Sequence, residues 1–159
     1  MISLEFDPGD IDSIVQTARS ITGSPELGKL SGFRLTDDGS LVFDQSIKLK
    51  TTVRLGLSCD ASGRLLIEIL QLMDSRFGNS MIKTGIELGS LVSESFGGKE
   101  ISLADIAANS SKGLLVKVSD DVLAFDPSDL PFLQKAKLNV LFRTVEIRDS
   151  KLFVQAELR

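Results

Sequence analysis

The stretch LVFDQSIKLKTTVRLGLSC, residues 41–59, decides the fold. Its odd-numbered positions are almost all apolar, and its even-numbered positions are almost all polar. Side chains of a β-strand point alternately to opposite faces of a sheet, so a period of two predicts one very long strand with an apolar face and a polar face. Only Gln45 and Thr51 dilute the apolar face, and only Val42 is strongly hydrophobic on the polar one.

This predicted strand is long for a chain of this size. At about 3.3 Å per residue it would span roughly 60 Å. A compact domain of 159 residues has a radius of gyration near ~15 Å. The strand must therefore bend sharply, break at Gln45 or Thr51, or belong to an elongated molecule, and Gly56 is a further position for a bend.

The rest of the chain predicts a single domain over residues 1–159, without an internal linker. Asp7 followed by Pro8 is typical of a helix start. The turn residues Asp37-Asp38-Gly39 and Asp60-Ala61-Ser62-Gly63 separate strands. The expected elements are an N-terminal helix over about 8–22, strands over 30–36, 41–59 and 64–72, a main helix over 75–96, a short helix over 102–109, and C-terminal strands over 113–126, 137–148 and 151–158.

Residues 75–96 change from a period of two to a helical period. At about 100° per residue, the apolar residues that gather on one side are Phe77, Met81, Leu88, Leu91 and Val92. Ile82, Ile86 and Phe96 widen this apolar arc to more than half of the circumference. A helix with so broad an apolar arc must be mostly enclosed. The predicted fold is α+β, with a long, strongly curled antiparallel sheet wrapped against this one major amphipathic helix.

The composition argues against most catalytic classes. The chain has no histidine and one cysteine, Cys59, which excludes Ser-His-Asp and Cys-His catalysis, His-containing zinc sites and intrachain disulfides within one chain. The net charge is −4 and the basic residues are dispersed, which argues against nucleic-acid binding. Gly-rich phosphate-binding loops are also missing. We therefore expect a protein that is not an enzyme and has no metal or cofactor.

Clusters of carboxylates have ordinary structural explanations. Asp7, Asp10 and Asp12 could suggest calcium, but their spacing lacks the EF-hand pattern, and helix capping explains them. The pairs Asp37-Asp38 and Asp120-Asp121 fit turns, where adjacent side chains rarely converge on one substrate. These residues are therefore expected to have structural roles.

No signal peptide or transmembrane segment is expected. The first residues, MISLEFDPGD, lack a basic start and an apolar core. Nowhere do 18 or more apolar residues follow one another. A cytoplasmic or peripheral membrane location is the default expectation.

The surplus of apolar strand surface suggests a function. If the main helix fills the trough of the sheet, the result is an ordinary core; if it does not, the trough is a groove of the size of a lipid. Burying one methylene contributes about 0.8 kcal/mol, so an acyl chain could bind without specific polar contacts. The residues expected to line the groove are Leu41, Phe43, Ile47, Leu49, Val53, Leu55 and Leu57, with Met81, Leu88 and Val92 opposite.

Three segments together resemble the tubular lipid-binding (TULIP) superfamily in its small, single-module bacterial form. They are GFRLTDDGSLVFDQSIKLKTTVRLGL (32–57), SDDVLAFDPSDLPFL (119–133) and KLNVLFRTVEIRDSKLFVQAEL (137–158), combined with an amphipathic N-terminal helix. The resemblance covers most of residues 10–159. It implies a strongly curved sheet around a long helix and non-catalytic binding of lipid or another apolar ligand. The missing export signal departs from many bacterial members, and no catalytic residue carries over.

A second hypothesis from the same sequence is a scaffold or protein-interaction module. Such a module would form a homo-oligomer through a long sheet edge or an apolar patch, without a small ligand. An enzyme is the third hypothesis, and it would need two carboxylates from distant segments that converge in one pocket. The oligomeric state and the presence of a bound ligand separate the first two hypotheses.

Overall fold

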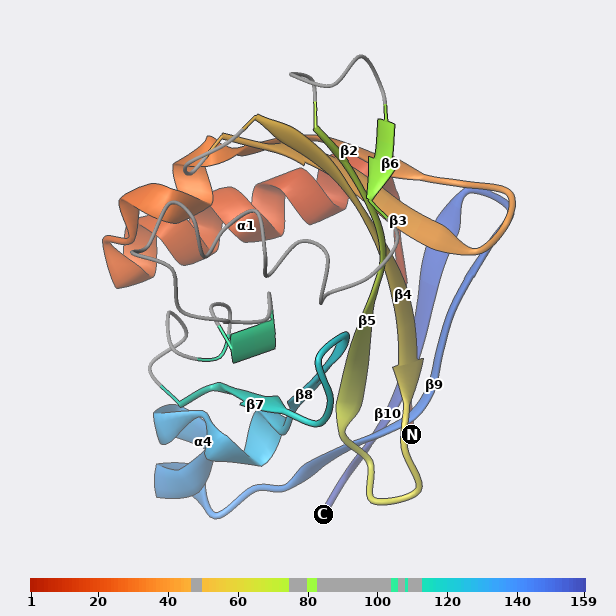
Figure 1. The fold of residues 1–159 in the computed structure, drawn as a ribbon. Coiled ribbons are helices and arrows are strands. Elements are labelled where there is room, and N and C mark those ends of the chain that lie inside the picture. Colours follow the sequence, from red (N-terminus) through yellow and green to blue (C-terminus); the bar gives the residue numbers. More distant parts are fainter. Residues whose placement is uncertain (47–49, 75–79, 83–103, 106–107, 109–112) are drawn as a thin grey trace.

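Two antiparallel β-sheets and a few helices build an α+β fold (Figure 1). The structure is a computed structural model, and it describes residues 1–46, 50–74, 80–82, 104–105, 108 and 113–159. Among these residues, no helix is long and apolar enough to cross a membrane. The helical elements are α1 (Pro8–Thr22), α4 (Pro131–Ala136) and the 3₁₀ turns η1 (Pro25–Lys29) and η3 (Pro127–Asp129).

The smaller sheet combines the two ends of the chain. Its strands are β1 (Ile2–Phe6), β9 (Val140–Arg148) and β10 (Lys151–Leu158), in the order β1-β10-β9. A two-residue turn joins β9 to β10, and both of its residues, Asp149 and Ser150, have positive φ angles of 52° and 58°. This conformation matches the twist of the strands that it connects.

The larger sheet contains the middle of the chain. Its strands lie in the order β2-β3-β4-β5-β8-β7, and β6 pairs with β5. Their bounds are β2 (Leu30–Leu35), β3 (Ser40–Gln45), β4 (Thr51–Cys59), β5 (Leu65–Asp74), β6 (Ser80–Ile82), β7 (Leu115–Lys117) and β8 (Val122–Phe125).

The predicted single strand over 41–59 is wrong, because these residues form the antiparallel pair β3 and β4. The chain reverses between Gln45 and Thr51, the two polar positions at which a break was expected. The pairing sets Leu41 opposite Leu55 and Phe43 opposite Val53, so odd-numbered residues meet odd-numbered residues. The alternation therefore assigned the two faces correctly, although it could not show that the chain turns back.

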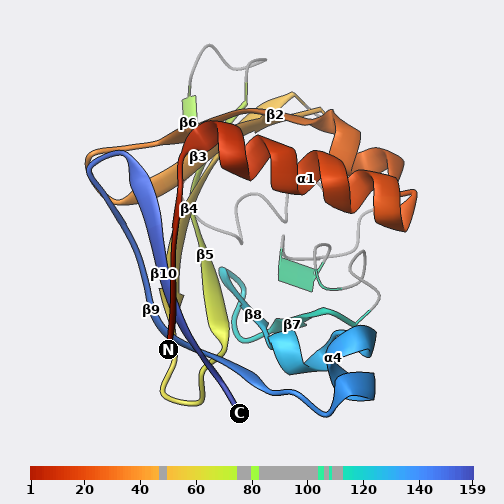
Figure 2. The same cartoon turned by 180° about the vertical axis from the view of Figure 1, so that it is seen from behind.

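The predicted strongly curled sheet is not what the structure shows, and the major helix predicted against it is contradicted at residues 80–82. As far as the described residues go, neither sheet is strongly curled or closed (Figures 1 and 2). Residues 80–82, inside the predicted helix 75–96, form the strand β6, which extends the sheet beside β5. The remainder of that predicted helix lies outside the described residues, as does most of the short helix predicted over 102–109, of which 104–105 and 108 are helical.

Helix α1 begins and ends at the signals present in its sequence. The backbone N–H of Asp10 donates to Asp7 Oδ1 over 2.8 Å, and the backbone N–H of Asp7 donates to Asp10 Oδ2 over 3.0 Å. This reciprocal capping box satisfies two backbone donors at the helix start. Gly23 ends the helix in the left-handed conformation, with φ of 67°, and its N–H donates to the carbonyl of Arg19. Capping is therefore the role of this acidic pair.

The core lies where the two sheets and the first turns of α1 meet. Its buried members come from four elements: Ile11, Leu35, Leu41 and Ile147. Side chains from both sheets pack around them: Phe6, Phe33, Phe43, Leu55, Leu57 and Leu152. The apolar side of the β3–β4 pair is thus covered in part by the smaller sheet and α1.

Candidate functional site

The apolar side of the larger sheet extends across four neighbouring strands. We call this surface the apolar sheet face and define it by Leu41, Phe43, Val53, Leu55, Leu57, Leu65, Ile67, Ile69, Leu72, Leu123 and Phe125. Cross-strand register connects these residues, since Leu57 lies opposite Ile67, and Ile67 lies opposite Leu123 on its other side. Neighbouring apolar pairs of this kind stabilise a sheet and form a continuous apolar surface.

A β-bulge keeps this face apolar along β5. Arg54 lies opposite Gln71, whereas Leu55 lies opposite Ile69, so Leu70 has no partner in the register of β4. Beyond the bulge, the even-numbered residues of β5, and no longer the odd-numbered ones, lie on the apolar sheet face. Leu72 consequently packs with Val53 in a second buried cluster. The side chain of Leu70 lies over Gly56, where an added Cβ would come within 3.4 Å of Leu70 Cδ1. A side chain at position 56 would therefore be in ordinary van der Waals contact with the displaced leucine.

Burial is uneven over the apolar sheet face. Leu41 and Val53 are 9% exposed, and Leu72 and Leu123 are 3% exposed. The other members are partly buried, including Leu55, Leu57, Ile67 and Ile69. The face therefore combines a well-packed part with positions that keep some contact with solvent.

The residues predicted to line a groove divide into three groups. Leu41, Phe43, Val53, Leu55 and Leu57 do gather on the apolar sheet face, where they contact the protein's own side chains. Met81 belongs to strand β6, opposite Met73, instead of a helix facing the sheet. The positions outside the described residues are Ile47, Leu49, Leu88 and Val92.

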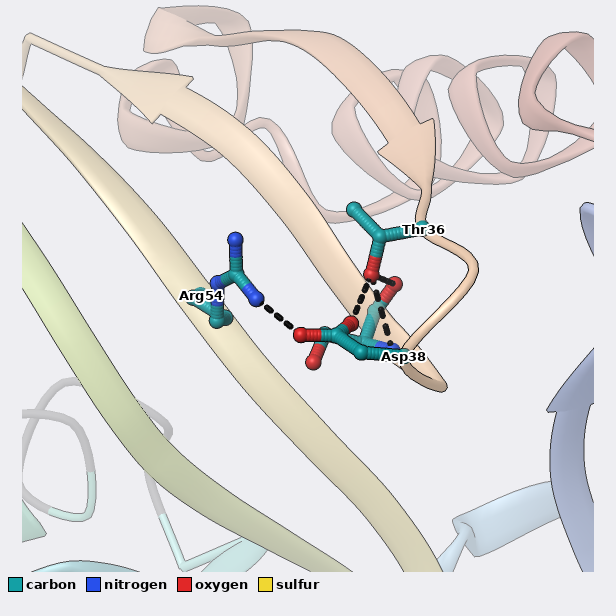
Figure 3. Close-up of polar contacts among 4 residues, drawn as sticks. Thr36, Asp38 and Arg54 are labelled. Atoms are coloured by element: carbon teal, nitrogen blue, oxygen red, sulfur yellow. Dashed lines mark hydrogen bonds and ion pairs between the residues drawn. The ribbon is translucent and has the colours of Figure 1, made fainter.

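The polar side of the β3–β4 pair holds the preceding turn in place. The side chain of Asp38 accepts hydrogen bonds from the Thr36 hydroxyl and the Arg54 guanidinium (Figure 3). The Thr36 hydroxyl, together with Ser40 and Arg54, lowers the pKa of Asp38 below its ordinary value of 3.8. The contacts join the β2–β3 turn to the middle of β4, which is a structural role.

A second carboxylate anchors the turn between β4 and β5. Asp60 Oδ1 accepts from the Ser62 hydroxyl at 2.7 Å and from the backbone N–H of Arg64 at 3.0 Å, while Oδ2 accepts from Arg64 Nε at 2.8 Å. The Ser62 hydroxyl first, and then the Arg64 backbone and side chain, lower the pKa of Asp60 to about 2. Within the part of the chain that is described, no group of three or more acidic or cysteine side chains is placed to hold a metal ion.

The outer side of the smaller sheet has a shallow depression of about 350 Å³. Its lining residues are Ser3, Leu4, Thr144, Glu146, Arg148, Phe153, Val154 and Gln155. The guanidinium carbon of Arg148 lies 4.2 Å from the centre of the Phe153 ring, and Arg148 Nε lies 3.3 Å from Glu146 Oε1. The sequence contains a signal for this feature, because Phe153 is a large aromatic residue on the polar side of an alternating strand.

Exposed apolar side chains also occur on the edge strand β1. Ile2 is 43% exposed and Leu4 is 49% exposed. Both residues occupy the same side of the strand as Phe6, which packs into the core. In Figure 2, β1 runs from the N-terminus to α1 at the margin of its sheet. An apolar edge of this kind is a feature of surfaces that associate.

Comparison of the chain with models of protein families, with curated proteins and with solved structures found no match. Three surfaces of the described residues are therefore the candidates for function. Two of them are apolar, namely the apolar sheet face and the β1 edge. The third is the depression on the outer side of the smaller sheet, around Arg148 and Phe153.

Proposed function

We propose that this chain binds a lipid or another apolar ligand and is not an enzyme. The observation that supports this proposal is the apolar sheet face, which continues over β3, β4, β5 and β8 and stays only partly buried at several positions. Removing apolar surface from water stabilises a complex by about 25 cal/mol per Å². An acyl chain laid across this face would therefore bind without a specific polar partner.

The proposed contact residues are the partly buried members of the predicted lining. Phe43, Leu55 and Leu57 would touch the ligand, whereas Leu41 and Val53 would support them from within the core. The resemblance to the TULIP superfamily implies the same class of ligand. Members of that superfamily fold a strongly curved sheet around a long helix. The helix expected in this chain over 75–96 is replaced by strand β6 at residues 80–82, and the rest of that range lies outside the described residues.

Native mass spectrometry of the purified chain, followed by organic extraction, tests this proposal. We expect a co-purifying apolar molecule and displacement of a bound fluorescent apolar dye by a fatty acid. Leu57→Asn should weaken dye binding because it places an amide on the apolar sheet face. Ser58→Asn is the matched control, since Ser58 is the next residue of β4, is exposed and points to the opposite face. A chain without extractable ligand that also fails to bind the dye would contradict the proposal.

The second candidate function is a self-associating interaction module. The observation that favours it is the exposure of Ile2 and Leu4 on the edge strand β1. Sedimentation at several protein concentrations distinguishes the two candidates. A strict monomer that carries a ligand favours lipid binding, and a dimer without ligand favours the interaction module.

A further inference from the structure

One edge of strand β1 is not paired with any described strand, which suits it to pairing with another strand. Among the described residues, β1 pairs with β10 alone, and its register from Ile2 to Phe6 is continuous. Unpaired backbone N–H and C=O groups on such an edge are a template for a further strand. Natural edge strands often prevent this pairing with proline, a bulge or a charged side chain. ISLEF has no proline or bulge, and its one charged residue, Glu5, is paired with Lys151 of the same chain.

The sequence of β1 is also compatible with a second copy of itself. The apolar residues Ile2, Leu4 and Phe6 alternate with Ser3 and Glu5. Directly opposed residues of an antiparallel pair lie on the same face. Two copies are related by a two-fold axis between their strands. They can therefore match apolar to apolar and polar to polar residues only when one residue lies directly opposite its own copy at this axis.

Three of these registers place an inner residue of the strand, Ser3, Leu4 or Glu5, at the axis, and physical chemistry separates them. An axis at Glu5 places two carboxylates directly opposite each other, which is destabilising, and sets Ile2 opposite Pro8, which cannot donate a backbone hydrogen bond. An axis at Ser3 sets the charged Glu5 opposite Met1 and matches only Ile2, Ser3 and Leu4 with residues of the opposing strand. An axis at Leu4 pairs all residues of the strand, with Ile2 opposite Phe6 and Ser3 opposite Glu5.

The charge on this edge is already compensated in the register centred on Leu4. Lys151 Nζ lies 2.8 Å from Glu5 Oε1 within the same chain. The opposing residue would be Ser3 of the second copy, whose hydroxyl can donate to the carboxylate. Pairing would thus bring no like charges into direct opposition and would cover the exposed side chains of Ile2 and Leu4.

We propose that β1 pairs with β1 of a second copy of this chain, antiparallel and centred on Leu4. The two smaller sheets then form one continuous sheet across the two-fold axis. This inference rests on the second candidate function, self-association, and specifies the surface and the register that perform it. The interface is short, so the dimer is expected to be weak and to dissociate on dilution.

Sedimentation velocity of the whole chain over a wide range of concentrations tests the surface. The unmodified chain should shift from monomer to dimer as concentration rises. Leu4→Lys should keep it monomeric, because two ammonium groups would meet at the axis. Val116→Lys is the matched control, since Val116 is 51% exposed on another edge strand, β7, and this variant should still dimerise. Circular dichroism confirms that both variants fold.

Cysteine cross-linking in a Cys59→Ser background tests the register. Ser3→Cys, Leu4→Cys and Glu5→Cys each place a thiol on one of the three possible axes, and a disulfide needs Cβ atoms about 3.5–4.5 Å apart. Leu4→Cys should give the covalent dimer fastest on mild oxidation.

The outcomes separate this inference from the function on which it rests. A dimer that survives Leu4→Lys, or that cross-links faster through Ser3→Cys or Glu5→Cys, overturns the proposed pairing and leaves self-association in place. A chain that is monomeric at every concentration overturns both.

Discussion

Gln45 Nε2 donates a hydrogen bond to Thr51 Oγ1 over 2.5 Å, and this contact connects the last residue of β3 to the first residue of β4. The two residues are also direct cross-strand partners. Thr51 is buried, with 6% of its surface exposed. The two polar residues on an otherwise apolar face thus bond to each other beside the reversal of the chain.

Replacing Thr51 by valine should destabilise the fold. The change keeps the shape of the side chain but removes the acceptor of the Gln45 amide. A lost hydrogen bond of a buried group typically costs about 1–3 kcal/mol. Urea unfolding followed by circular dichroism measures the change in the free energy of unfolding.

A double-mutant cycle with Gln45→Met separates the hydrogen bond from other effects of each substitution. The double variant should lose less free energy of unfolding than the sum of the two single variants, because it replaces both partners of the hydrogen bond at once. For residues in contact, the expected coupling is about 0.5–3 kcal/mol. Strictly additive losses would show that the contact contributes nothing to stability.

This pair also explains how far the sequence could predict the fold. The period of two sorted the side chains of 41–59 onto the correct faces, because the cross-strand register matches odd-numbered with odd-numbered residues. A continuous strand and a hairpin of this register give the same alternation of apolar and polar residues. The alternation therefore could not reveal the reversal of the chain. The only local signal was the polar character of Gln45 and Thr51.

The helical period of 75–96 failed at residues 80–82 for a related reason. A three-residue strand such as β6 is too short to establish its own period within a window of helical spacing. Its position is determined by pairing with β5, a contact that local sequence does not encode. Tertiary pairing therefore overrode the local pattern there.

The candidate site was predictable in part. The sequence identified the apolar residues of β3 and β4, but it could not show that the smaller sheet and α1 cover part of them. That covering requires Ile147, which is distant in the chain, to pack against Leu41. The bulge at Leu70, which brings Leu72 onto the apolar sheet face, was equally invisible in the alternation.

Replacing Gly63 by alanine should destabilise the protein by two separate effects. Gly63 has a φ of +86°, which L-residues adopt at a cost of about 1–2 kcal/mol. An added Cβ would also lie 2.8 Å from the Cβ of Leu141. The Gly63 carbonyl accepts from the backbone N–H of Phe142, so the β4–β5 turn and β9 cannot separate without losing this bond. Thermal unfolding of the variant measures the combined loss.

Gly113→Ala is the matched control for that variant. Gly113 has a similar φ of +89°, but an added Cβ would meet no atom of the described residues within 4 Å. The stability lost by Gly113→Ala should therefore come from the unfavourable backbone conformation alone. Gly63→Ala should lose a further ~1–3 kcal/mol of stability through overpacking. Equal losses at the two positions would contradict the close approach of Gly63 to Leu141.

The pKa of Asp38 should respond more strongly to Thr36 than to Arg54. The Thr36 hydroxyl is the largest single cause of the lowered pKa, followed by Ser40; the charge of Arg54 and its hydrogen bond are two smaller, separate causes, and glutamine removes the charge while keeping a hydrogen-bond donor. Thr36→Val should therefore raise the pKa of Asp38 more than Arg54→Gln does. NMR titration of the Asp38 carboxyl carbon measures both shifts. A larger rise in Arg54→Gln would show that the ion pair, and not the turn, determines the charge state.

Asp60 should make the stability of the protein depend on pH in the acidic range. Its pKa falls from 3.8 to about 2 in the folded chain. A carboxylate with a lowered folded pKa contributes stability that is fully present above its unfolded pKa and is lost as pH falls through its folded pKa. The contribution of Asp60 should therefore disappear between pH ~4 and pH ~2. Urea unfolding across this range should show a smaller pH dependence for Asp60→Asn than for the unmodified chain.

Ser62→Ala tests the cause of that shift without removing the carboxylate. The Ser62 hydroxyl is the largest contributor to the lowered pKa of Asp60, and its Oγ lies 2.7 Å from Asp60 Oδ1. Without it, the folded pKa should move back towards 3.8, while the bonds from the backbone N–H groups of Ser62 and Arg64 remain. The acid-dependent loss of stability should then begin at the same pH but be smaller, because only the folded pKa moves. If NMR titration finds the pKa of Asp60 unchanged in Ser62→Ala, the Arg64 contacts must hold the carboxylate in its charged form instead.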